Sequence, residues 1–224
     1  MFKFSHPLWI TAALLCAATA LPAQSVRVTD LGIGKLLVAR RDFPDPNFAE
    51  TVILLVQHDE QGAAGLVINR KTKVPISQAL QQLKGANNWS GLVYAGGPVA
   101  TTGVLALLRS HVKPEEMQPV LGEIYLVSSK PLLEKLLAEG PAAADLHVYL
   151  GYSGWGAGQL ENEVNLGAWY IIDGKPGLVF DSDPASLWSR LIAQKEQRFA
   201  RVRTPLRKSL QAYQRAAAIP SEGR

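Results

Sequence analysis

The residues with the most chemical potential lie in one segment, 151–161, which reads GYSGWGAGQLE. A serine between glycines is typical of a nucleophile elbow, where G-x-S-x-G exposes the hydroxyl on a sharp strand-to-helix turn. Gly151 and Ser153 match this pattern, but Trp155 stands where the last glycine should be, and a bulky indole conflicts with that turn. The candidate bases carry no local signature: they are His58, His111 and His147. We therefore predict no catalytic serine.

The same segment could instead hold a phosphate. A dinucleotide fingerprint would begin at Gly156 and Gly158, but Glu161 replaces its third glycine, and the chain contains no Gly-Lys-Ser/Thr phosphate loop. Glu161 and Glu163 also fall in the first turn of the helix expected next, where carboxylates already compensate the positive helix end and would repel phosphate. The sequence therefore predicts no nucleotide cofactor, and we expect none of another kind.

The third interpretation of the segment is structural, with a binding surface as its functional counterpart. Glycines let two backbones approach closely, and Tyr152 and Trp155 supply large apolar areas that can hold the segment in place. Such a segment could also contact a small molecule or a protein. Gly96 and Gly97 form a turn by default, and as a second glycine cluster they could line the same cleft.

His58 follows an apolar run and precedes an acidic turn, a place where a histidine usually closes a strand end but could also act as a ligand or base. Asp42 and Asp45 lie in a proline-containing loop, where carboxylates usually accept loop hydrogen bonds. Scattered histidines and acids do not form a metal-ligand pattern, so no metal site is predicted. The complete candidate binding surface is Gly151, Tyr152, Ser153, Gly154, Trp155, Gly156, Gly158, His58, Gly96 and Gly97.

The elements expected around these residues mix hairpins with strand–helix steps, which favours an α+β fold over a doubly wound parallel sheet. Apolar runs predict strands at 34–39, 51–57, 65–69, 92–95, 102–108, 123–127, 146–150, 168–172 and 178–180. Helices are expected at about 75–83, 131–138, 159–165 and 184–192, the last capped by Asp183 with Pro184 at its first position. Several strands are apolar throughout, which indicates a sheet that is buried on both faces or curled.

The ends of the chain differ from its middle. Residues 8–21 carry no charge and precede small residues, so residues 1–24 are predicted to be a cleaved signal peptide rather than a membrane span, with an uncleaved anchor as the alternative. The only cysteine, Cys16, lies in this leader, so the mature protein would contain neither disulfides nor a thiol nucleophile. We expect no stable transmembrane segment after cleavage and a periplasmic or secreted protein, with a cytoplasmic location as the alternative.

The C-terminal tail, residues 194–224, has eight Lys and Arg residues against two Glu. Thr204-Pro205 is a good helix start, and Leu206, Leu210 and Tyr213 then share one face. A basic amphipathic helix within Lys195 to Arg215 could bind nucleic acid or an anionic membrane surface. The simpler interpretation is a solvated extension whose apolar stripe packs on the body.

The motifs together resemble the YqgE/AlgH family. The resemblance runs from about 34 to 192 and depends on GKLLVA at 34–39, DPNF at 45–48, TVILL at 51–55, His58 followed by GAAGLVIN at 62–69, GGPV at 96–99 and GYSGWGAGQLE at 151–161. It implies one compact α+β domain at 31–193 with a mixed sheet bent into a pseudo-barrel and packed by several helices. Members carry the label of transcriptional regulator but have no agreed reaction, metal or cofactor, and they normally lack both a leader and a basic tail.

Three functions follow from these observations. The first is a non-enzymatic binding or regulatory domain, exported, that contacts a protein or small molecule through 151–158. The second is an intracellular transcriptional regulator that binds nucleic acid through its basic tail. The third is an uncharacterised small-molecule enzyme that uses the 151–158 segment.

Overall fold

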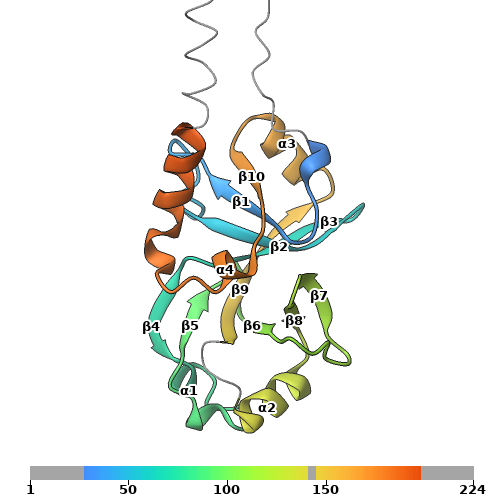
Figure 1. The fold of residues 1–224 in the computed structure, drawn as a ribbon, viewed down its shortest axis with the longest axis vertical. Helices are drawn as coiled ribbons and strands as arrows, with labels where there is room; N and C mark the ends of the chain where they lie inside the picture. Colours follow the sequence, from blue (N-terminus) through green and yellow to red (C-terminus); the bar gives the residue numbers. More distant parts are fainter. Residues whose placement is uncertain (1–27, 141–144, 198–224) are drawn as a thin grey trace, which may run out of the picture.

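The computed structural model describes residues 28–140 and 145–197 of the chain (Figure 1). The predicted leader with Cys16 and most of the basic tail, including Thr204-Pro205, lie outside these residues. The strands are β1 (Lys35–Ala39), β2 (Val52–Asp59), β3 (Gly62–Val67), β4 (Lys71–Pro75), β5 (Leu92–Ala95), β6 (Val99–Arg109), β7 (Gln118–Leu121), β8 (Ile124–Val127), β9 (Leu146–Gly156) and β10 (Trp169–Asp173). The helices are η1 (Val28–Asp30), α1 (Ile76–Ala79), η2 (Ala86–Asn88), α2 (Lys130–Glu139), α3 (Gln159–Asn165), α4 (Pro176–Val179) and a final helix through 184–197.

The strands form one curled, mixed sheet, which confirms the expected α+β class. Its main path runs β10-β1-β2-β3-β9-β6-β8-β7, and β4 and β5 form a branch that joins it at β9. The β5–β9 pair is parallel, and the other pairs among the described strands are antiparallel. β9 therefore connects the two halves: its first part pairs with β5 and β6, and its last residues pair with β3.

Three glycines allow β9 to change partners. Gly151 has a φ of 71°, in the left-handed region that favours glycine, at the point where β9 leaves β5. A Cβ atom on Gly96 would lie 2.3 Å from the Gly151 carbonyl oxygen, and one on Gly97 would lie 2.2 Å from the Tyr152 carbonyl carbon. The junction thus requires backbone-to-backbone contact, which brings the two glycine clusters next to each other.

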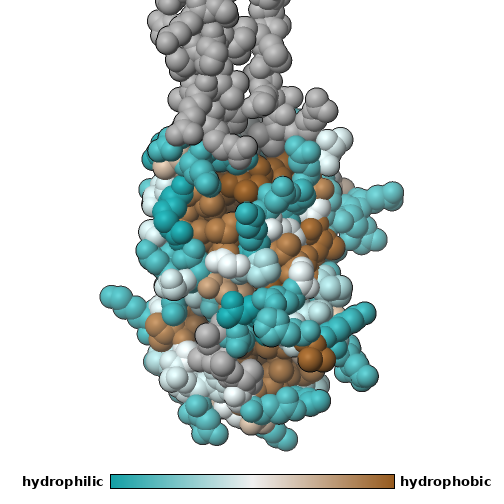
Figure 2. All heavy atoms as spheres, in the orientation of Figure 1, coloured by the Kyte–Doolittle hydropathy of each residue, from teal (hydrophilic) through white to brown (hydrophobic). Residues whose placement is uncertain are grey.

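Both faces of the sheet are buried along the apolar strands β1, β2 and β8, as their sequences predicted. Leu36 of β1 packs in one cluster with Leu187 of the final helix, whereas Leu37 packs on the opposite face with Trp169. α1, η2 and α2 cover a third cluster at the β5–β6–β9 end. Hydrophobic residues nevertheless remain visible between hydrophilic ones over both halves of the molecule (Figure 2).

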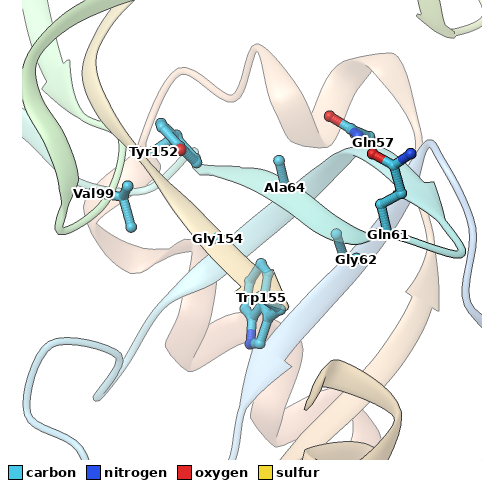
Figure 3. Close-up of a pocket in the computed structure, with 9 residues that line it drawn as sticks. Gln57, Gln61, Gly62, Ala64, Val99, Tyr152, Gly154 and Trp155 are labelled. Carbon is cyan, nitrogen blue, oxygen red and sulfur yellow. The ribbon is translucent and has the colours of Figure 1, made fainter. Parts of the chain in front are cut away.

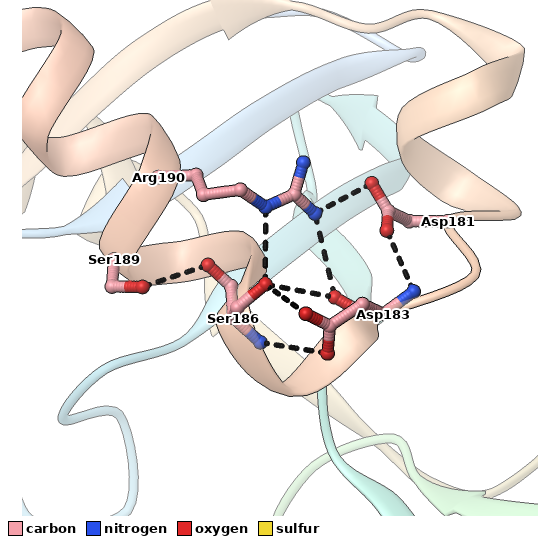
Figure 4. Close-up of polar contacts among 5 residues, drawn as sticks. All are labelled: Asp181, Asp183, Ser186, Ser189 and Arg190. Carbon is pink, nitrogen blue, oxygen red and sulfur yellow. Dashed lines mark hydrogen bonds and ion pairs between the residues drawn. The ribbon is translucent and has the colours of Figure 1, made fainter.

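The final helix begins as its sequence predicted, through a side-chain cap (Figure 4). Asp183 accepts hydrogen bonds from the Ser186 amide at 3.4 Å and from the Ser186 hydroxyl at 2.5 Å, so its carboxylate occupies the capping position ahead of Pro184. Arg190 donates to Asp181 at 2.7 Å from the next turn. These contacts fix the first turns of the helix.

This helix is longer than expected, and it contacts the sheet and the segment after β1 along its described length. Trp188 donates to the Ala39 carbonyl at 2.7 Å, and Arg41 donates two hydrogen bonds of 2.9 Å to Glu196. Lys195, where the predicted nucleic-acid or membrane segment begins, donates to the Ile171 carbonyl at 3.1 Å. The first residues assigned to the tail therefore belong to the packed body.

Three expectations about the elements were wrong, and two strands were not predicted. Residues 151–156 continue β9 instead of forming a loop, because β3 supplies a partner strand there. Residues 178–180 were expected to be a strand, but Pro176 begins the short helix α4, and the helix expected at 75–83 is the single turn α1. β4 and β7 were missed because their polar residues and prolines hide a strand pattern; β4 has the exposed sequence KTKVP.

We predict that Gly97→Ala lowers the free energy of unfolding by more than about 3 kcal/mol, because the added methyl group overlaps the backbone of Tyr152 and Ser153. Gly156→Ala is the matched control, since a Cβ atom at Gly156 meets nothing within 4 Å. Urea denaturation followed by tryptophan fluorescence measures both variants. Equal stability of the two variants would contradict a sterically closed junction.

Candidate functional site

A shallow hollow of about 430 Å³ lies over the β3–β9 pair (Figure 3). Its floor is made of small residues from the two paired strands, Gly62, Ala64 and Gly154, so the backbone is accessible there. Its rim carries the amides of Gln57 and Gln61 from the β2–β3 hairpin. The remaining lining residues are Ala63, Val99, Tyr152 and Trp155. These groups can make hydrogen bonds and apolar contacts.

The predicted site residues divide between the two faces of the sheet. Side chains alternate along β9, so Tyr152 lies on the side of the hollow with Ala64, whereas the Trp155 ring packs in the opposite cluster with Ala63. His58 is paired with Ala63 across the hairpin and belongs to that opposite side. Gly96 and Gly97 lie at the junction beneath Tyr152 and do not line the hollow. The candidate surface is therefore not one continuous site.

Trp155 anchors the segment, as the structural interpretation predicted. Its side chain is 5% exposed, and its ring stacks on Phe48 at 6.0 Å between centroids and meets Trp169 edge-on at 6.2 Å. The indole donates to Glu163 Oε2 at 3.0 Å, and Trp169 donates to the same oxygen at 2.8 Å. Glu163 was expected to compensate the helix end; instead, it lies beyond the first turn of α3 and holds two indoles together.

His58 also has a structural partner. Its Nε2 lies 2.8 Å from Glu161 Oε1, with the two side chains 23% and 30% exposed. The hydrogen bond from His58 lowers the pKa of the Glu161 carboxyl and outweighs the opposing effect of partial burial. The pair fastens α3 to the β2–β3 hairpin, next to Gly156 and Gly158.

Ser153 is fully buried, and its hydroxyl contacts the Gly96 carbonyl oxygen at 3.5 Å. The histidines of the described segments have other partners: His58 meets Glu161, His111 meets Glu123, and His147 stacks on Tyr94. The hydroxyl therefore has neither a base nor access to solvent in this arrangement.

Six lining residues were not predicted from the sequence: Gln57, Gln61, Gly62, Ala63, Ala64 and Val99. The hairpin that carries the first five was expected, and alternation along its strands would have placed Gln57 and Ala64 on one face. The missing information was the pairing of β3 with β9, which joins segments far apart in the chain.

Within residues 28–140 and 145–197, no three His, Cys, Asp or Glu side chains gather closely enough to hold a metal ion. No helix of these two segments is long and apolar enough to cross a membrane.

A family model described as AlgH-like matches residues 36–200. The chain belongs to the AlgH-like family. It is 36% identical over 177 residues to a UPF0301 protein of Streptomyces coelicolor, a match that covers 76% of this chain and 90% of the relative. It is 37% identical over 163 residues to the UPF0301 protein AlgH of Pseudomonas aeruginosa, covering 70% of this chain and 85% of the relative.

The fold of this AlgH-like chain agrees with solved structures. It is similar to the solution structure of AlgH from P. aeruginosa with a TM-score of 0.59 and 36% identity, over 71% of this chain and 86% of that one. A crystal structure of DIP2367 from Corynebacterium diphtheriae also has a TM-score of 0.59, at 18% identity, over 73% of this chain and 87% of that one; this second likeness concerns the fold alone. The names of these relatives and solved structures state no activity.

The His58–Glu161 contact makes a prediction about pH. Because the folded-state pKa of Glu161 is lowered, its stabilising contribution is present above the unfolded value of 4.5 and is lost as the pH falls through the lowered folded value. We expect Glu161→Gln to reduce the free energy of unfolding by about 0.5–1 kcal/mol in mildly acidic buffer and to have a smaller effect in a buffer well below pH 4.5. Urea denaturation at both pH values measures this difference.

The control for this pair is Glu123→Gln, which removes a contact to His111, whose side chain is 90% exposed. It should change stability less than Glu161→Gln does. If Glu161→Gln lowered the free energy of unfolding equally at both pH values, the charge of the carboxylate would make no contribution to stability.

Proposed function

We propose that this protein is an exported, non-catalytic binding domain whose contact surface is the hollow over β3 and β9. The partner is a protein segment or small molecule that presents neutral hydrogen-bonding and apolar groups. The observation that carries this proposal is the chemistry of the lining: two glutamine amides, a tyrosine and an exposed valine surround a floor of small residues.

The small floor favours a bound group that approaches the sheet closely. Gly62, Ala64 and Gly154 leave the space above β3 and β9 open, while Val99, 37% exposed, offers apolar surface at the edge. Gln57 and Gln61 carry amides, which donate and accept hydrogen bonds as the amides of a polypeptide do. The Gln57 nitrogen already donates one hydrogen bond to Asp59 at 2.9 Å. Neutral amides at the rim match a neutral partner better than a phosphate.

The fixed positions of Trp155 and Ser153 support binding over hydrolysis. Trp155 is held by two ring contacts and one hydrogen bond, so the last part of β9 forms a rigid base for the hollow. Ser153 lies inside the sheet junction. A preformed surface on rigid strands reduces the entropy lost on binding.

Export is supported by the uncharged run at 8–21 and the small residues that follow it. An exported protein does not contact chromosomal DNA, so this proposal excludes direct control of transcription.

The hollow can be tested by site-specific photo-crosslinking in the native host, with a photoreactive phenylalanine analogue in place of Gln61. We expect a discrete crosslinked product, reduced at least about fivefold by Ala64→Arg, because the long side chain fills the hollow. The same analogue at the exposed Gln82, outside the hollow, is the control. An identical set of products at both positions, or insensitivity to Ala64→Arg, would refute the assignment.

Export has its own measurement, mass spectrometry of the N-terminus of protein isolated from the native host. We expect mature chains that start between about residues 21 and 25, as the A-x-A spacing of Ala18 and Ala20 indicates. Recovery of chains that retain Met1 would favour the cytoplasmic alternative.

A further inference from the structure

A second pocket, of about 330 Å³, lies between the β4–β5 pair and the beginning of β9. It shares no lining residue with the hollow over β3 and β9. Its volume is at the lower end of the range for small-molecule sites. The lining residues are Lys71, Ser90, Gly91, Leu92, Tyr94, Leu146 and His147.

One wall of this pocket is a row of stacked rings. The His147 imidazole lies between two aromatic rings, with centroids 4.6 Å from Tyr94 and 4.3 Å from Phe180. A cation lies at each end of the row: Lys71 Nζ is 6.0 Å from the Tyr94 ring, and the Arg109 guanidinium is 5.0 Å from the Phe180 ring. The stacking covers both faces of the imidazole, so a ligand can meet only the ring edges.

The charge of this region is unbalanced. Arg109 is neutralised by Asp145, with contacts of 2.7 and 2.8 Å. Lys71, in contrast, has no carboxylate partner in the described part of the chain, and neither Asp nor Glu lines the pocket. Burial, Lys71 and Arg109 together lower the pKa of His147 to about 4, so the imidazole is neutral at physiological pH. The pocket therefore carries the positive charge of Lys71.

Polar groups without partners lie around the same row. His147 Nδ1 and the Tyr149 hydroxyl are buried and have no hydrogen-bond partner among the described residues. The Tyr149 ring is 5.3 Å from Tyr94, and the Tyr94 hydroxyl is 3.4 Å from His147 Nε2, a long contact. Buried polar groups are normally paired, so each unpaired one requires an explanation, and a bound water or ion is one such explanation.

We propose that this pocket binds a small oxyanion-bearing molecule, a carboxylate or a phosphate, through the Lys71 ammonium and the polar edges of Tyr94 and His147. The ammonium supplies the charge. The Ser90 hydroxyl, at the exposed side, can donate a further hydrogen bond. The stacked rings hold the imidazole edge in a fixed orientation.

The test uses the full chain and two probes, inorganic phosphate and succinate, in an NMR titration of the histidine side chains. We expect saturable shifts of the His147 signals with a Kd at or below about 1 mM for at least one probe. The bound anion offsets the Lys71 charge, so the pKa of His147 should rise from about 4. Which probe saturates distinguishes phosphate from carboxylate recognition.

Two variants separate this site from nonspecific anion binding. Lys71→Gln should weaken binding at least about tenfold, whereas Lys73→Gln, which removes the same charge from the same strand outside the pocket lining, should leave it unchanged. Tyr94→Phe keeps the ring stack but removes the hydroxyl, and should also weaken binding. The proposal is overturned if neither probe saturates, or if both lysine variants bind like the unchanged protein.

Discussion

The fold depends on the contact of two backbones where Gly96 and Gly97 meet Gly151 and Tyr152. No side chain larger than hydrogen fits at Gly96 or Gly97, and Gly151 adopts the conformation that lets β9 leave one set of partners and join another. The Val67 amide donates to the Gly96 carbonyl at 2.9 Å, and the Gly96 amide donates to Leu150 at 2.8 Å. This small junction therefore joins β3, β5 and β9 into one sheet.

The hollow and the aromatic cluster are consequences of that junction. Because β9 turns toward β3, its last residues alternate between an open face with Tyr152 and Gly154 and a closed face with Trp155. Glu163 then accepts hydrogen bonds from both Trp155 and Trp169, which ties β9, α3 and β10 together through one oxygen atom. The floor of the hollow is held in place because the opposite side of the sheet is packed by the aromatic cluster.

The sequence was informative wherever local chemistry decides the structure. The α3 boundaries, the Asp183 cap and the buried strands β1, β2 and β8 followed from turn residues, capping and apolar runs. It was uninformative where pairing with a distant segment decides whether residues form a strand or a loop. Residues 151–156 have the glycines of a loop and become strand only because β3 pairs with them, and His58 and Trp155 share a face that no local pattern reveals. The lining of the hollow was hidden for the same reason.

β9 also determines how much of the chain must be present before the sheet can be completed. Its partners β3, β5 and β6 all precede it in the chain. The edges of these strands that pair with β9 therefore stay unpaired until residues 146–156 are present. Unpaired edges of this kind invite association with other chains, and pairings between distant segments form slowly because long loops must close first. The late strand thus delays completion of the sheet relative to a fold built from neighbouring hairpins alone.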